Sequence, residues 1–199
     1  MAGLYLHIPF CKQACHYCNF HFSVSQRHRD RFVDALIREL FMQRNFFNGN
    51  ILAESKTRLT SIYFGGGTPS ILSGDEIIRI FKAIGEYFLF DSDTEITLEA
   101  NPDDLSMEKM SLLRQTPVNR LSIGIQSFHH ADLKYMNRAH SPAQAYRAVE
   151  NAYRAGYSNL NIDLIYGTPT MTDTGWKTNL HALAAMDVAH VSAYALTVE

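Results

Sequence analysis

The chain has 199 residues, of which 46% are hydrophobic and 19% charged, and its formal net charge is −2. This composition is ordinary for a globular domain, and the nearly balanced charge does not favour a nucleic-acid partner. No apolar run approaches the roughly 18–20 residues that a membrane-spanning helix needs. The N-terminal residues lack the charged start and long apolar run of a signal peptide, so we expect a cytoplasmic protein without a transmembrane segment.

Strand-like and helix-like segments alternate along the chain. In residues 26–46, for example, apolar side chains recur with helical spacing at Phe32, Leu36 and Leu40. Ser73, with Glu76 three residues later, forms a capping box at the start of another helix. The strands are predicted at residues 4–8, 59–64, 95–100, 120–126, 160–166 and 191–197, and the helices at residues 26–46, 73–88, 106–115, 142–155 and 174–186.

The recurring strand–helix order implies a parallel sheet with right-handed crossovers. Such a sheet is either an open, partial barrel or a flat, doubly wound sheet. A sheet covered by helices on both faces has almost continuously apolar strands, whereas three strands here keep a polar or small side chain at every second position. We therefore predict an α/β fold, a partial (β/α)6 barrel with a wet lumen. Glu99, Gln126 and Asp163 are expected toward its carboxyl rim, where such folds bind ligands.

All three cysteines lie in one loop after the first strand, at Cys11, Cys15 and Cys18, in a C-x3-C-x2-C pattern. An odd number of clustered thiols does not make a disulfide framework, and in a reducing compartment clustered thiols more often bind metal. The usual [4Fe–4S] cubane takes four thiolates, so three would leave one iron open. The alternatives are zinc, with His16 or His21 as the fourth ligand, and three unrelated core cysteines.

A glycine run, Gly65-Gly66-Gly67, follows the second strand and is succeeded by Thr68 and Pro69. Glycines at this place let a ligand approach the backbone amides and carbonyls. Taken alone, such a run is more typical of a tight turn. Its position near the cysteine loop favours a ligand-binding role.

Residues 4–18 and the Gly-Gly-Gly-Thr-Pro loop resemble radical S-adenosylmethionine (SAM) proteins, in the group of oxygen-independent coproporphyrinogen III oxidase. The resemblance extends over essentially the whole chain. It implies that the three cysteines hold a [4Fe–4S] cluster whose open iron binds SAM. Reductive cleavage of SAM would then give methionine and a 5′-deoxyadenosyl radical.

The same resemblance implies which residues bind the cofactor. A first SAM is expected to contact Tyr5, Tyr17, Gly66 and Glu99, and a second SAM position to draw on Gly67, Thr68, Gln126, Arg138 and Asp163. For each polar side chain taken singly, the alternative is an ordinary hydrogen bond at a strand end. Their joint occurrence in order favours the cofactor role, and it leaves open whether one or two SAM molecules bind.

Three histidines, His7, His16 and His21, flank the cysteine loop. We expect them to pack around this loop. The alternative is that they contact a porphyrin propionate or a haem iron. No Ser–His–Asp arrangement, HExxH motif or P-loop is found in the sequence.

Two features separate the sequence from the oxidase. The oxidase pattern has a fourth cysteine two residues after the third, where this chain has Phe20, and the oxidase's long N-terminal extension is missing. Both features match HemW-type relatives, which are understood as haem-binding chaperones that insert haem into respiratory proteins. We therefore expect a haem chaperone whose partners are haem or a porphyrin and a haem-receiving respiratory protein. Coproporphyrinogen oxidation is the alternative, and enzymatic cleavage of SAM and the electron donor stay open.

Residues 1–199 are predicted to form one radical SAM core domain that stops after the sixth strand. The sixth helix and the C-terminal domain of the family have no counterpart in the sequence. An uncovered last strand would leave an open sheet edge and an apolar face. We therefore expect poor solubility, or reliance on a partner.

Overall fold

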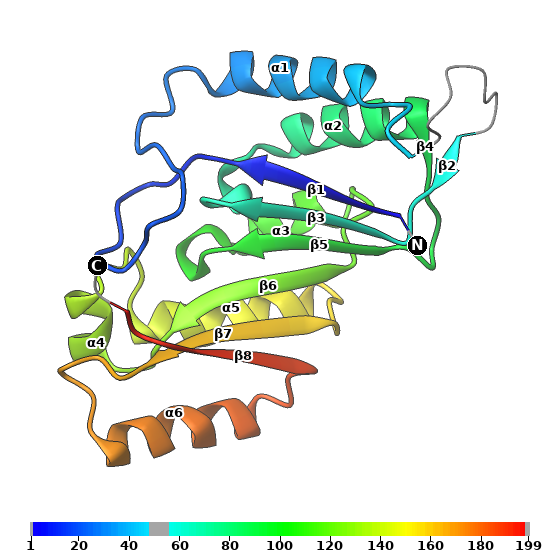
Figure 1. The fold of residues 1–199 in the computed structure, drawn as a ribbon. Coiled ribbons are helices and arrows are strands. Elements are labelled where there is room, and N and C mark those ends of the chain that lie inside the picture. The colour runs from blue at the N-terminus through cyan, green and yellow to red at the C-terminus, as the bar shows by residue number, and fades with distance from the viewer. Residues whose placement is uncertain (1, 48–55, 198–199) are drawn as a thin grey trace.

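The centre of the structure is a parallel sheet of six strands. The structure is a computed structural model that describes residues 2–47 and 56–197. Across the sheet the strands are β1 (Gly3–Ile8), β3 (Ser61–Gly66), β5 (Glu95–Ala100), β6 (Arg120–Gln126), β7 (Leu160–Tyr166) and β8 (His190–Ala195). With right-handed crossovers, this sequential order places the connecting helices on one face, whereas a doubly wound sheet reverses its order. Figure 1 shows the curved sheet with its helices on the outer side, so the predicted partial barrel is confirmed.

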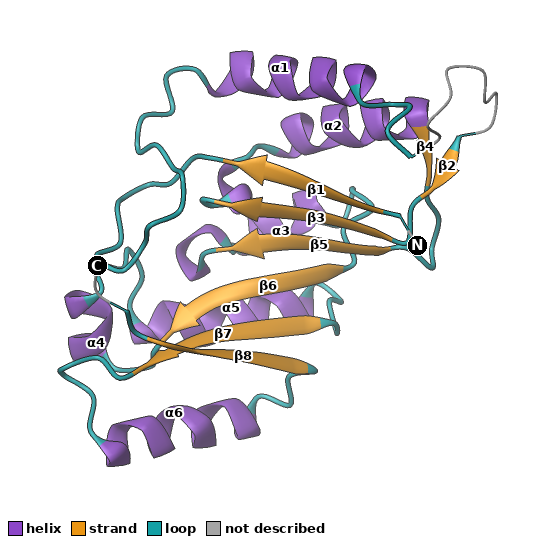
Figure 2. Cartoon of the chain, in the orientation of Figure 1, coloured by secondary structure: helices purple, strands orange, loops and turns teal. Residues whose placement is uncertain are grey.

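Helices connect successive strands on the outer face (Figure 2). They are α1 (Arg29–Met42), α2 (Gly74–Tyr87), α3 (Met107–Leu113), α5 (Pro142–Arg154) and α6 (Asp173–Ala185), and the short α4 (His130–Tyr135) precedes α5. The predicted capping box begins α2: Ser73 Oγ accepts a hydrogen bond from the Glu76 N–H at 3.2 Å, and the Glu76 carboxylate accepts one from the Ser73 N–H at 2.7 Å. Two donors at the end of the helix are thereby satisfied.

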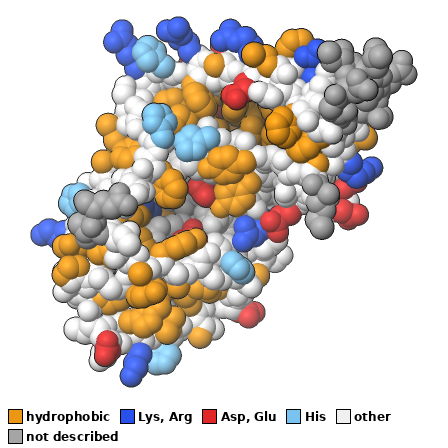
Figure 3. All heavy atoms as spheres, viewed as in Figure 1, with side chains coloured by type: hydrophobic (Ala, Val, Ile, Leu, Met, Phe, Trp, Pro, Cys, Tyr) orange, Lys and Arg blue, Asp and Glu red, His pale blue; other side chains and the backbone are white. Residues whose placement is uncertain are grey.

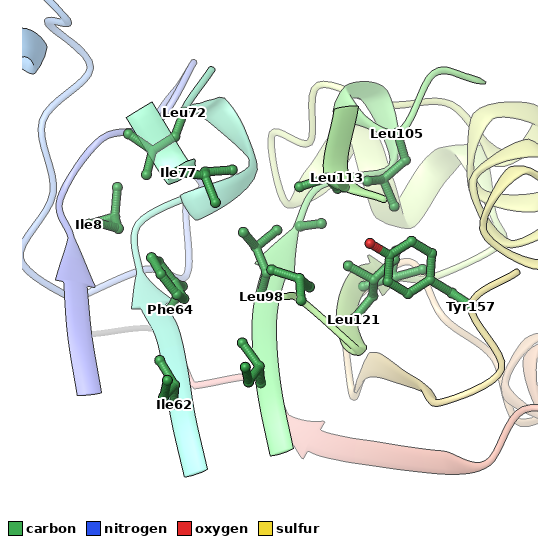
Figure 4. Close-up of a cluster of buried hydrophobic side chains, with 14 of the residues drawn as sticks. Ile8, Ile62, Phe64, Leu72, Ile77, Leu98, Leu105, Leu113, Leu121 and Tyr157 are labelled. Carbon is green, nitrogen blue, oxygen red and sulfur yellow. The ribbon is translucent and has the colours of Figure 1, made fainter. Parts of the chain in front are cut away.

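The hydrophobic core lies between the sheet and these helices (Figure 4). Every second side chain of β3, β5 and β6 points into it, as Ile62, Phe64, Leu98 and Leu121 do, and each of these four is fully buried. The intervening side chains of the same strands face the concave side. The alternation predicted from the sequence is therefore confirmed, and it divides an apolar outer face from a polar inner one.

Several boundaries differ from the predictions. The first helix ends at Met42 instead of residue 46. The Gln43 N–H still bonds to the Glu39 carbonyl, but the Arg44 N–H bonds to the Phe41 carbonyl, three residues back, which closes the helix with a tightened turn. The second strand continues to Gly66, since its pairing with β1 extends through the glycines. The last strand is β8, two residues shorter at its end than predicted. The sequence predicted neither α4 nor the short parallel pair of β2 (Thr57–Arg58) and β4 (Phe88–Leu89).

The loops after the carboxyl ends of the strands gather at one edge of the sheet, the cysteine loop among them (Figure 2). At the other edge of the sheet, β8 pairs with β7. Its Val191 and Tyr194 side chains are exposed, and the expected low solubility depends on such exposed apolar side chains. None of the helices in the described ranges is long and apolar enough to cross a membrane.

Candidate functional site

A cavity of about 570 Å³ occupies the concave face, between the cysteine loop and the inner sides of β3 to β8. The face seen in Figure 3 is hollowed near its middle, and acidic atoms are visible in the hollow. The cavity walls include eleven of the predicted site residues: Cys11, Cys15, Tyr17, Cys18, Gly66, Gly67, Thr68, Glu99, Gln126, Arg138 and Asp163. Segments far apart in the sequence thus meet at the carboxyl rim of the barrel.

Tyr5 is the predicted site residue that does not line this cavity. Its ring is 58% exposed and stacks on the ring of Tyr63, with 5.9 Å between centroids. Tyr63 lines the cavity and its hydroxyl donates to Glu99 Oε1 at 2.8 Å. Tyr5 therefore contacts a residue of the cavity wall, Tyr63, and a direct contact between Tyr5 and a cofactor stays a prediction.

The cysteine loop is held in place from two sides. At its start, the Cys11 N–H donates to the Ser23 carbonyl at 3.0 Å, so the loop closes on itself. At its middle, it rests on the turn after α4: Asn137 Nδ2 donates to the Ala14 carbonyl at 2.7 Å, and the His16 N–H donates to the Met136 carbonyl at 3.1 Å. These contacts hold the backbone of the loop that carries the three thiols.

The glycine loop passes close beneath the cysteine loop. The Gly67 N–H donates to the Ile8 carbonyl at 2.8 Å, and the Thr68 N–H to the Phe10 carbonyl at 2.7 Å. A Cβ on Gly67 would lie 2.8 Å from the Phe10 carbonyl oxygen and 3.0 Å from Cys11 Sγ. Gly66 has a φ of +113°, and a Cβ there would meet the His7 ring at 2.8 Å. Both glycines are thus required by close packing, and Gly66 also by its backbone conformation.

The carboxylate of Glu99 faces the cavity from the end of β5. Besides the bond from Tyr63, its Oε2 accepts one from the Gly66 N–H at 3.2 Å. Burial raises the pKa of Glu99, and the negative charge of Asp163 raises it further. A cationic ligand group at this place would relieve both effects, because an opposite charge favours the ionised carboxylate.

The guanidinium of Arg138 joins four parts of the site. Nη1 donates to Cys15 Sγ at 3.4 Å and to the Tyr17 hydroxyl at 3.2 Å. Nη2 donates to Asn101 Oδ1 at 2.7 Å and to the Gly124 carbonyl at 2.8 Å. Arg138 therefore links the cysteine loop to the ends of β5 and β6, and it brings positive charge beside the thiols.

Two buried polar atoms of the cavity wall have no protein partner among the described residues: Gln126 Oε1 and Arg138 Nε. Gln126 also has a φ of +65° and lies at an irregularity in the pairing of β6 with β7. A backbone in this conformation costs free energy and marks functional sites. Buried donors and acceptors without partners also cost free energy unless a ligand or a water molecule bonds to them. The residues present thus fit a polar ligand in this part of the cavity.

Asp163, on the inner face of β7, lies within a network of side chains. Its Oδ2 accepts a bond from Ser122 Oγ at 3.0 Å and its Oδ1 one from Asn161 Nδ2 at 2.8 Å. Ser192 Oγ, on β8, donates to Asn161 Oδ1 at 3.2 Å. Burial raises the pKa of Asp163, although these donors oppose the shift. The network ties the inner faces of β6, β7 and β8 together.

Sequence reasoning gave no role to Asn101 and Tyr63, although Asn101 lies two residues after Glu99 and Tyr63 three residues before Gly66. Asn101 bridges the site, since its Nδ2 donates to Thr68 Oγ1 at 3.3 Å while its Oδ1 accepts from Arg138. Tyr63 orients Glu99. Their positions gave the available signal, because Asn101 directly follows a strand end and Tyr63 shares the inner face of its strand with Gly65.

The three thiols are half-buried and unpaired by disulfides. Burial raises the pKa of Cys11 and of Cys18, and metal coordination would compensate by stabilising the thiolates. Among the described residues, no group of three His, Cys, Asp or Glu side chains converges on a point suited to a single metal ion. His16, one candidate fourth ligand for zinc, donates through Nδ1 to the Tyr135 carbonyl at 2.8 Å and belongs to no such convergent group among the described residues. An iron–sulfur cluster holds each thiolate on a separate iron and does not require such convergence.

The fold and the cavity together define a class: a partial α/β barrel with a thiol-bearing loop at the carboxyl rim of a polar lumen. Comparison with known proteins gives the family. The family model described as "Radical SAM superfamily" matches residues 5–183. The chain belongs to the radical SAM superfamily.

Named relatives cover the same region. The chain is 38% identical to the heme chaperone HemW of Lactococcus lactis, over 98% of this chain and 49% of the relative. It is 34% identical to HemW of Bacillus subtilis, over 100% of this chain and 51% of the relative. The solved coproporphyrinogen III oxidase (HemN) of Escherichia coli superimposes with a TM-score of 0.86 and 30% identity, over 98% of this chain and 44% of that chain. The chain thus spans about half the length of the relatives that it matches.

Proposed function

We propose that the chain is the SAM-binding core of a HemW-type haem chaperone, with residues 1–199 acting as one domain. Cys11, Cys15 and Cys18 hold a [4Fe–4S] cluster, and SAM occupies the cavity beside it. The observation that carries this proposal is the convergence, on one cavity, of the three thiols and the eight other predicted cofactor-binding residues that line it. With both cofactors bound, a cluster reduced by an external electron donor would supply the electron for any reductive cleavage of SAM.

Haem or a porphyrin is the proposed cargo, with a haem-receiving respiratory protein as the partner and the cytoplasm as the compartment. Two observations favour this over the oxidase. The two HemW relatives are 38% and 34% identical to the chain, whereas the superimposed oxidase is 30% identical. Phe20 stands where the oxidase pattern has its fourth cysteine, and its 69% exposed ring lines the cavity without offering a ligand for iron.

The test begins with anaerobic reconstitution of the chain with iron and sulfide. The proposal expects about four iron and four sulfide per chain, SAM binding by calorimetry, and a haem titration that saturates. Zinc in place of iron would overturn the assignment of the cysteines.

Coproporphyrinogen oxidation is the second candidate, favoured by the close superposition on the oxidase. The reconstituted chain is incubated anaerobically with coproporphyrinogen III and SAM, and decarboxylation of the propionate side chains is followed. The haem chaperone proposal expects haem binding without turnover. Product formation without haem binding would establish the oxidase instead.

The role of Glu99 gives a sharper test of the SAM site. Glu99→Gln removes the negative charge that would face a ligand ammonium group, so SAM should bind about tenfold more weakly or worse. Glu95→Gln is the matched control, because Glu95 lies on the same face of β5 at its other end and is 54% exposed. Calorimetric titration of both cluster-loaded variants measures the difference. Equal SAM affinity in the two variants would exclude Glu99 from the site.

A further inference from the structure

A second cavity of about 570 Å³ lies between α4 and the cysteine loop, outside the barrel lumen. Its walls include His16 and Tyr17 from the cysteine loop, Lys134 and Tyr135 from α4, Met136 from the turn after it, and Leu196 after β8. Its size falls within the range of small-molecule sites, about 300–1,000 Å³. Tyr17 lines both this cavity and the lumen, so the two cavities share the cysteine loop as a wall.

The apolar wall of this cavity adjoins a cluster that is separate from the main core. Met136, which lines the cavity, forms a small buried cluster with Leu133 and Ile165, against which the cavity residues Tyr17 and Leu196 pack. At the rim, the exposed Lys134 contributes a positive charge and His16 an imidazole. An apolar pocket that carries one cation and one nitrogen ligand suits a flat, apolar cofactor with carboxylate edges.

The orientation of His16 differs from that of three other described histidines, and His190, which is also held through Nδ1, does not line this cavity. His16 Nδ1 donates to the Tyr135 carbonyl at 2.8 Å, and since a carbonyl only accepts, the neutral ring keeps its lone pair on Nε2. His7, His129 and His140 do the reverse, because each places Nε2 against a backbone carbonyl. A ring fixed through Nδ1 with Nε2 open is the usual arrangement of a metal-binding histidine.

We propose that His16 is an axial ligand of haem iron, through Nε2, in the cavity between α4 and the cysteine loop. The inference rests on the proposed haem function and assigns that haem a place and a ligand. Haem would lie on the outer side of the loop whose inner side holds the three thiols. Lys134 would pair with a propionate.

The experiment uses the reconstituted, cluster-loaded chain, so that the cysteine thiols are occupied, and titrates it with haem. His16→Ala should weaken haem binding about tenfold or more, since it removes the iron–nitrogen bond. The variant's resonance Raman spectrum should lose the iron–histidine signature, and added imidazole should restore it by filling the space. Iron and sulfide content equal to wild type shows that the loop itself is intact.

Two controls isolate the iron bond. His21→Ala removes a histidine of the same loop that is exposed and does not line the cavity, and it should bind haem like wild type. Metal-free protoporphyrin should bind wild type and His16→Ala equally. A His16→Ala variant with wild-type haem affinity and spectrum would overturn the assignment of the ligand but leave the haem function standing. A cluster-loaded wild type that binds no haem would overturn both.

Discussion

At the scale of single residues, Arg138 shows why the site depends on a guanidinium. A planar guanidinium has five N–H groups in a fixed fork, and here four hydrogen bonds to Cys15, Tyr17, Asn101 and Gly124 use two of its nitrogens. The ammonium of a lysine has only three donors on a single nitrogen, so it could not bond to four partners placed around a planar group. The third nitrogen, Nε, is buried and has no hydrogen-bond partner among the described residues.

Gly67 is a position where one methyl group should disturb the site. In Gly67→Ala the new Cβ would overlap the Phe10 carbonyl and crowd Cys11 Sγ, so we expect a loss of about 1–3 kcal/mol in the free energy of unfolding. The iron content after reconstitution should fall as well. Gly85→Ala, in α2, is the control, because its new Cβ would lie 3.9 Å from its nearest neighbour, a ring carbon of Phe90. This substitution should raise the free energy of unfolding by about 0.5–1 kcal/mol, since alanine favours a helix more than glycine does. Urea unfolding compares the two, and similar effects would contradict the packing argument.

His140 gives stability a dependence on pH. Burial and the positive charge of Arg138 lower the pKa of His140 to about 4, while its Nε2–H donates to the Ile125 carbonyl at 3.0 Å. The unfolded chain therefore binds a proton below about pH 6.5, and the folded chain does not until about pH 4. Stability from this group is present above pH 6.5 and is lost as the pH falls.

The measurement compares wild type with His140→Gln, which keeps an N–H donor and does not titrate. Between pH 7 and pH 5, wild type should lose about 1–2 kcal/mol more of its free energy of unfolding than the variant. Urea titrations at the two pH values measure this difference. Parallel pH profiles would show that His140 titrates normally.

At the scale of elements, the cysteine loop has no regular structure of its own and takes its shape from its neighbours. The turn after α4 supports its middle through Asn137, and the 3-10 turn at Pro102–Asp104 supports its start through Lys12. Lys12 Nζ lies 2.7 Å from Asp103 Oδ2 and also pairs with Asp104. Asp104 Oδ2 in turn accepts a bond from Ser70 Oγ at 2.6 Å, which extends the support to the segment after the glycine loop.

Removing Lys12 should therefore cost more than removing an ordinary surface charge. The Asp103 and Asp104 side chains are only 11% and 6% exposed, and Lys12→Met would leave both without their cation, at a cost of about 1–3 kcal/mol. Arg79→Met is the control, since its partner Asp34 is 53% exposed and the pair should contribute less than about 1 kcal/mol. Chemical denaturation distinguishes them. If Arg79→Met proved as costly as Lys12→Met, the buried carboxylates would not be the cause.

At the scale of the whole molecule, the sequential strand order and the alternation within strands produce the site together. The order puts helices on the outer face alone, and the sheet curves around the inner one. The inner face is then free to hold polar groups, which a sheet covered on both sides could not bury cheaply.

The same architecture predicts an uneven distribution of local stability. β6 is paired on both edges and almost wholly buried, whereas β8 pairs with β7 and exposes most of its side chains. Amides of β5, β6 and β7 should exchange most slowly with deuterium, and those of β8 much faster. Hydrogen exchange read out by mass spectrometry, on peptides covering each strand, tests this. Protection of β8 equal to that of β6 would contradict it.

Local patterns were enough to predict the strand–helix alternation, the polar inner face, the capping box at Ser73 and the grouping of Glu99, Gln126 and Asp163 at one rim. These depend on neighbours in sequence and on the rule that parallel strands end at the same edge. The spacing of the cysteines and glycines, through the family resemblance, pointed to the cofactor site.

Only the tertiary structure decided which side chains meet. Asn101 between Thr68 and Arg138, Lys12 on its two aspartates, and His16 against α4 are contacts between segments 30 or more residues apart. Tyr5, predicted at the site, does not line the cavity itself but stacks on Tyr63, which does. The physical reason is that sequence periodicity sets the face on which a side chain lies, whereas packing of distant segments sets its partner.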